Sequence, residues 1–134
     1  MRKIEHIGIA VKSLDDAIIV YEKLLNTKCY KVEEVASEGV KTAFFKIGES
    51  KIELLEATNQ ESPIAKYLSK KGAGMHHIAY DVADIFAEIE RLKKEGFQLI
   101  QASPKEGADN KLIAFLHPKS TSGTLVELCQ ERGH

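Results

Sequence analysis

The stretch HIGIAV at residues 6–11 returns as HIAYDV at residues 77–82, 71 positions later. A second pair of stretches, KIELLE at 51–56 and LVELCQ at 125–130, repeats with an offset of 74 positions. All four stretches are rich in aliphatic and β-branched residues, which favours strands. Because the two offsets differ by only the length of a small loop insertion, the chain is predicted to contain two copies of one structural unit.

A helix is predicted after the first strand of each copy. Ser13 can cap the first helix, and acidic residues in the next turn suit the positive end of the helix dipole. The second helix is expected to begin at Asp84 and to stop at Gly96. A third, short helix between the copies has Ser62 as its cap and Gly72 after its end.

The remaining apolar stretches predict the rest of the sheet, at 28–35 and 40–47 in the first copy and at 98–101 and 112–116 in the second. Each copy then has the order βαβββ. We predict an α+β fold in which two βαβββ modules form a cupped, eight-stranded mixed sheet with the helices outside. The modules span about 4–58 and 75–131, joined by the short helical linker within one domain of residues 1–134.

The composition argues against several classes of function. The 134 residues are 43% hydrophobic and 29% charged, which is typical of one globular domain. With 19 basic and 20 acidic residues the chain lacks the excess of positive charge that nucleic acid requires, and it has no long apolar run for a membrane or a signal region. We expect a cytoplasmic protein with neither partner, in which Cys29 and Cys129 are thiols rather than a disulfide.

Four polar side chains are predicted to face the concave side of the sheet. Strand alternation places His6 on one face with Gly8 and Ala10, and His77 on one face with Ala79, so small neighbours leave room for a ligand. Glu53 and Glu127 lie among aliphatic residues, where an unpaired carboxylate must be neutralised, paired or bound to a metal.

These four residues recur in register, as one His and one Glu in each copy. Packing alone does not account for such a repeat. A mixed set of nitrogen and oxygen ligands suits a divalent ion such as Co²⁺, Zn²⁺, Ni²⁺ or Mn²⁺. We therefore predict a metal site made of His6, Glu53, His77 and Glu127.

The same motifs resemble those of the vicinal-oxygen-chelate superfamily, which includes glyoxalases and bleomycin-resistance proteins. Within it, the chain is most similar to the methylmalonyl-CoA epimerases. Besides the repeated strands, the resemblance rests on the stretches SPIAKYL at 62–68, GMHHIA at 74–79, FLHPKS at 115–120 and GTLVEL at 123–128. It covers nearly the whole chain, and it places the metal ligands of the family on the same four residues.

The resemblance implies metal-dependent epimerisation of methylmalonyl-CoA, in which the C2 proton leaves and returns through a metal-stabilised enolate. Two bases on opposite faces are needed, and Glu53 and Glu127 are the expected pair. A further acidic residue proposed as catalytic in some epimerases would fall near Thr42, which cannot be a base. The family resemblance also leads us to expect a homodimer with an acyl-CoA or thiol-adduct substrate.

Other readings stay open at this point. Two His and two Glu are also the ligand set of bacterial-type glyoxalase I, which acts on the hemithioacetal of methylglyoxal and glutathione. Some epimerases have Gln where this chain has Glu53. A ring-cleaving dioxygenase would be expected to have three protein ligands, and a non-catalytic binding protein would be expected to lack the full set.

Overall fold

The computed structural model describes residues 1–132, and the chain divides into two compact units. One unit is His6–His76, and the other joins Met1–Glu5 to the chain from His77 onward. The first five residues therefore belong with the second copy of the repeat. Arg2 ties them there, because its backbone N–H donates to the Asp81 carbonyl at 2.8 Å and its Nε atom lies 2.6 Å from the Asp81 carboxylate. That both units form one domain stays a prediction.

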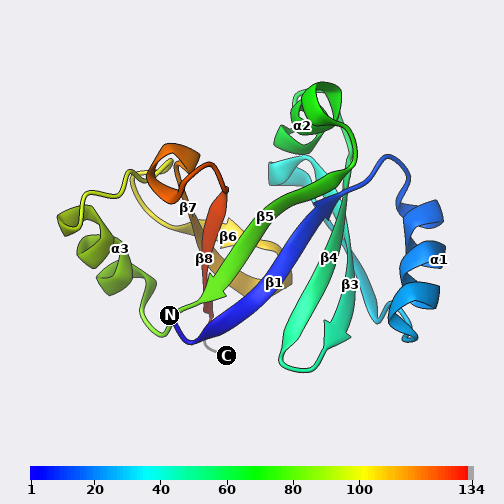
Figure 1. The fold of residues 1–134 in the computed structure, drawn as a ribbon, viewed down its shortest axis with the longest axis horizontal. Coiled ribbons are helices and arrows are strands. Elements are labelled where there is room, and N and C mark those ends of the chain that lie inside the picture. The colour runs from blue at the N-terminus through cyan, green and yellow to red at the C-terminus, as the bar shows by residue number, and fades with distance from the viewer. Residues whose placement is uncertain (133–134) are drawn as a thin grey trace. The chain divides into compact units, whose positions relative to one another are not determined.

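The unit of residues 6–76 is built on four strands in the order β2-β3-β4-β1. The pairing of β1 with β4 is parallel, and the other pairings are antiparallel. Figure 1 shows α1 packed along this sheet. The elements are β1 (Lys3–Ala10), which begins in the preceding segment, α1 (Leu14–Leu25), β2 (Lys31–Val35), β3 (Val40–Ile47), β4 (Ser50–Ala57) and α2 (Pro63–Lys71).

The other unit repeats this plan with four strands in the order β5-β8-β7-β6. Here the pairing of β5 with β8 is parallel, and the others are again antiparallel. The elements are β5 (Gly74–Asp81), α3 (Ile85–Lys94), β6 (Lys105–Gly107), β7 (Lys111–Leu116) and β8 (Val126–Glu131). Residues 1–132 thus contain two βαβββ modules with eight strands, which confirms the predicted α+β class.

In each unit one face of the sheet is covered by the first helix. Val11 and Leu54 pack with Phe45 against the apolar side of α1, and Val82 and Leu128 belong to the corresponding cluster under α3. Because successive side chains of a strand point to opposite faces, the predicted ligands lie on the other face of each sheet. The core thus fixes which side chains share that second face.

The predicted helix starts are confirmed. The side chain of Ser13 accepts a hydrogen bond from the backbone of Asp16, and Ser62 and Asp84 cap α2 and α3 in the same manner. These caps satisfy N–H groups that have no partner within the helix. They are local features, which is why sequence alone identifies them.

The strand predicted at 98–101 is wrong. An isolated bridge joins Leu99 to Leu116 there, and the edge strand is β6, which begins four residues after the predicted strand ends. Gly107 explains the position of β6, because a Cβ atom on it would lie 2.7 Å from the side chain of Ile113. Glycine allows the close approach of β6 to β7, which a hydrophobicity pattern does not reveal.

Both cysteines are free thiols, as predicted, with Cys129 buried and Cys29 partly buried. Over residues 1–132, no helix has both the length and the apolar character needed to cross a membrane.

Candidate metal centre

In the unit of residues 6–76, His6 and Glu53 are in contact. The Nδ1 atom of His6 lies 3.1 Å from Oε2 of Glu53. The parallel register explains the contact, because Gly8 of β1 is the partner of Glu53 in β4, and His6 precedes Gly8 by two residues on the same face. Because Gly8 has no side chain, no side chain of the intervening position on that face lies between Glu53 and His6.

The other unit contains the same arrangement. The Nε2 atom of His77 lies 3.0 Å from Oε1 of Glu127. Ala79 of β5 is the partner of Glu127 in β8, and His77 precedes Ala79 by two residues. The predicted repeat therefore extends to the register of the parallel strand pair, and each unit presents one imidazole and one carboxylate on its helix-free side.

The four side chains are withdrawn from water, with between 4 and 8% of their surface exposed. A carboxylate in such surroundings needs a partner that compensates its charge. Within each unit the imidazole supplies one contact, and imidazole nitrogen with carboxylate oxygen is a donor set that divalent ions of the first transition row accept. The residues therefore fit the predicted ion chemically.

Each glutamate has further support in its own unit. Glu127 Oε2 accepts a hydrogen bond from the Cys129 thiol at 3.1 Å, and the His77 ring lies edge-on to Phe115 with 5.9 Å between the centroids. Phe115 is also the β7 partner of Glu127, as Phe44 is the β3 partner of Glu53. Each glutamate therefore has a phenylalanine as its cross-strand neighbour on the same face of the sheet.

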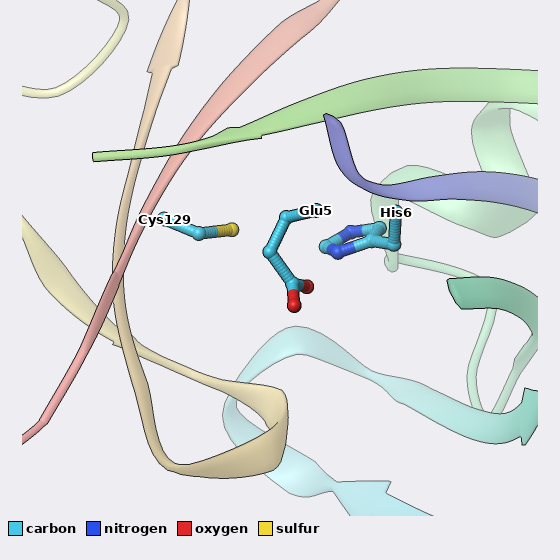
Figure 2. Close-up of side chains that lie close together, drawn as sticks. All are labelled: Glu5, His6 and Cys129. Carbon is cyan, nitrogen blue, oxygen red and sulfur yellow. The ribbon is translucent and has the colours of Figure 1, made fainter. Parts of the chain in front are cut away.

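Glu5 is a buried acid that the sequence reasoning missed. It is 2% exposed, and one of its carboxylate oxygens lies within 4.8 Å of the Cys129 sulfur. Figure 2 shows this carboxylate and the thiol, with the ring of His6, the residue that follows Glu5 in the chain. The signal was present in the sequence, since Glu5 occupies a strand position directly before a predicted ligand.

A buried cation accompanies Glu5. The Nζ atom of Lys111 lies 3.9 Å from Glu5 and 3.6 Å from Glu131, and Lys111 is 6% exposed. The sequence repeat does not reveal this cation, because Lys111 has no basic counterpart in the first copy. The position of Lys111 at the start of an apolar strand is the only sequence signal for it.

Comparison with known families agrees with this architecture. The sequence model of the Glyoxalase/Bleomycin resistance protein/Dioxygenase superfamily matches residues 5–115. The chain belongs to this superfamily. The match includes three of the four predicted ligands and the parallel pair of β1 with β4, and it ends in β7, before Glu127.

Similar members of the superfamily are epimerases by name. The chain is 40% identical to the ethylmalonyl-CoA/methylmalonyl-CoA epimerase of Cereibacter sphaeroides, over 96% of this chain and 97% of that protein. It is 38% identical to the mitochondrial methylmalonyl-CoA epimerase of Homo sapiens, over 96% of this chain and 73% of that protein. A solved variant of the Streptomyces coelicolor methylmalonyl-CoA epimerase, in complex with 2-nitronate-propionyl-CoA, is similar with a TM-score of 0.95 and 34% identity, covering 99% of both chains.

Proposed function

We propose that this protein is a methylmalonyl-CoA epimerase, an isomerase that inverts C2 of the acyl group of a CoA thioester. The observation that carries the proposal is the buried His–Glu contact found in the same strand register in both units. A reaction that removes a proton on one face and returns it on the other needs two similar sets of groups. The similarity to known epimerases supports methylmalonyl-CoA as the substrate.

In this proposal one divalent ion, Co²⁺, Zn²⁺, Ni²⁺ or Mn²⁺, would be held by His6, Glu53, His77 and Glu127. When bound, such an ion would act as a Lewis acid towards negative charge on the substrate oxygens. The chain contributes ligands that are already ordered, because each imidazole and its carboxylate are held by neighbouring strands of one sheet. Preorganised ligands do not have to be brought together at the moment of reaction.

Proton transfer is assigned to the two glutamates. Glu127, as the carboxylate, takes the C2 proton of one stereoisomer, and Glu53, as the carboxylic acid, gives its own proton to the opposite face of the planar enolate. The roles are exchanged for the other stereoisomer, and at least one of the two glutamates would release the ion as the substrate binds. Cys129 donates a hydrogen bond to one Glu127 oxygen, which restrains the carboxylate while its other oxygen contacts His77. Burial keeps water from competing for the transferred proton.

Proton NMR of one stereoisomer of methylmalonyl-CoA in deuterated water tests the function. The protein loaded with Co²⁺ should exchange the C2 proton for deuterium and produce the other stereoisomer, and the same sample stripped with a chelator should do neither. Absence of both exchange and inversion across the four candidate ions would contradict an epimerase function.

Glyoxalase I has the same types of metal ligand, so its activity must be distinguished from epimerase activity. The same metal-loaded samples should therefore be incubated with the hemithioacetal of methylglyoxal and glutathione, and formation of the thioester followed by its ultraviolet absorbance. We expect no thioester to form. Faster turnover of the hemithioacetal than of methylmalonyl-CoA would reverse the assignment. The homodimer and the cytoplasmic location stay predictions.

A further inference from the structure

The side-chain hydroxyl of Thr42 is buried and makes no hydrogen bond to any described residue. It lies in the middle of β3 and is 1% exposed. Within the described part of the chain, its Oγ1 atom has no hydrogen-bond partner. A buried polar atom in that state loses its bonds to water without replacing them, so its retention calls for an explanation.

The strand pattern places this hydroxyl on the ligand side of the sheet. Ala43 and Phe45 belong to the cluster under α1, so Thr42 and Phe44 face the opposite way. Phe44 is the β4 partner of Glu53, and Thr42 is the partner of Leu55, two residues further along. Thr42 is therefore a diagonal neighbour of Glu53, on the same face as the His6–Glu53 contact.

The second copy of the repeat has an apolar residue at the position equivalent to Thr42. Cys129 follows Glu127 by two residues, as Leu55 follows Glu53, and its β7 partner is Ile113. Ile113 is thus the counterpart of Thr42, and it is buried in an apolar cluster with Ala79 and Cys129. Since the fold accepts a purely apolar side chain here, the hydroxyl of Thr42 is not required by the architecture.

We propose that the Thr42 hydroxyl donates a hydrogen bond to the free carboxylate of the bound methylmalonyl group, an inference that rests on the proposed function. A carboxylate entering a buried site must receive hydrogen bonds, and those to a charged acceptor are the stronger ones. A neutral donor beside Glu53 meets this need without an additional charge that would pair with the base. Thr42 thereby binds the substrate carboxylate and turns C2 towards Glu53.

The test compares Thr42→Val, which keeps the shape and removes the hydroxyl, with Thr42→Ser, which keeps the hydroxyl. The exposed Thr58 of the same unit provides a matched control, Thr58→Val. Calorimetry on metal-loaded protein measures the Kd for methylmalonyl-CoA and for propionyl-CoA, which lacks the carboxylate. The Tm of each variant is measured without ligand.

We expect Thr42→Val to raise the Kd for methylmalonyl-CoA about tenfold or more and to leave that for propionyl-CoA unchanged. Its Tm without ligand should equal or exceed that of the wild type, because an unpartnered hydroxyl is removed. Thr42→Ser and Thr58→Val should bind both ligands like the wild type.

Three results would overturn the inference: an unchanged Kd in Thr42→Val, an equal loss for both ligands, or a lower Tm, which would reveal a structural partner. Each of these leaves the proposed function intact if the wild type still inverts methylmalonyl-CoA. If the wild type neither binds nor inverts it, the proposed function fails, and the role of Thr42 fails with it.

Discussion

The Oε1 atom of Glu56 accepts a hydrogen bond from the backbone N–H of Leu14, the first residue of α1, at 2.6 Å. The other unit repeats the contact, because Oε1 of Gln130 accepts from the N–H of Ile85 at the start of α3, at 2.7 Å. Both acceptors lie three residues after the glutamate of the predicted metal site. The strand that positions a ligand therefore also anchors the helix that covers its other face.

Removing the Glu56 acceptor should lower stability without affecting the ligands. We expect Glu56→Ala to reduce the free energy of unfolding by about 1 kcal/mol, the usual loss for a helix-capping side chain, and Glu56→Gln to retain most of it. Urea denaturation followed by circular dichroism measures both. Glu49→Ala, at an exposed position of the same unit, is the control and should change little. A loss in Glu56→Gln as large as in Glu56→Ala would show that charge, not the acceptor atom, anchors α1.

Local and repeated features of the fold could be predicted from sequence. Helix caps such as Ser62 and Asp84 are set by residues within one turn. The alternation around His6 and around His77 predicts which face of its own sheet each histidine occupies. The repeat predicted one histidine and one glutamate in each copy on the ligand side of the sheet. The contact between the two residues of each copy depends on the parallel strand register and was seen only in the structure.

Features that depend on contacts far apart in sequence could not be predicted. The Glu5–Lys111 contact joins residues on strands more than one hundred positions apart, and only the fold brings them together. The edge strand β6 was missed because its position depends on the space that Gly107 leaves for Ile113. The unpartnered hydroxyl of Thr42 likewise becomes visible only when its surroundings are known.

Metal removal should destabilise the protein. An ion present at about 100 times its Kd contributes roughly 2.7 kcal/mol, so stripping with a chelator should lower the Tm by roughly 10 °C, and added Co²⁺ should restore it. His6→Ala and His77→Ala should abolish this response to Co²⁺. The control His117→Ala changes a histidine outside the predicted site, which caps the turn after β7, and should retain the response. Equal Tm values for stripped and Co²⁺-loaded wild-type protein would argue against a metal centre.

The two-base mechanism predicts opposite defects for the two glutamates. Glu127→Gln and Glu53→Gln should each reduce net epimerisation by about 100-fold or more, the usual contribution of a general base. Uptake of deuterium at C2 should be lost from one stereoisomer in the first variant and from the other stereoisomer in the second. Full exchange in metal-loaded Glu127→Gln, from both stereoisomers, would exclude Glu127 as an essential base.

Glu88 should add a small pH-dependent term to stability. A hydrogen bond from Arg91 holds the pKa of this carboxyl below its ordinary value of 4.5. Because the folded pKa is lowered, the stabilisation is complete above the unfolded pKa and disappears as the pH falls through the folded value. Glu88→Gln should therefore lose up to about 1 kcal/mol at pH 7 and less at strongly acidic pH, measured by urea unfolding. A deficit that grows on acidification would have the wrong sign.

Removing the charge of Lys111 should lower the free energy of unfolding more than removing that of Glu88. With Lys111→Met, the Glu5 carboxylate stays buried without its cation, and loss of one partner from a buried ion pair costs about 3–5 kcal/mol. Lys94→Met, at an exposed position of the same unit, should change stability little. The double variant Glu5→Gln with Lys111→Met should recover most of the loss, because no unpaired charge is left. If the double variant is as unstable as Lys111→Met alone, the aliphatic packing of Lys111, and not its charge, stabilises this part of the sheet.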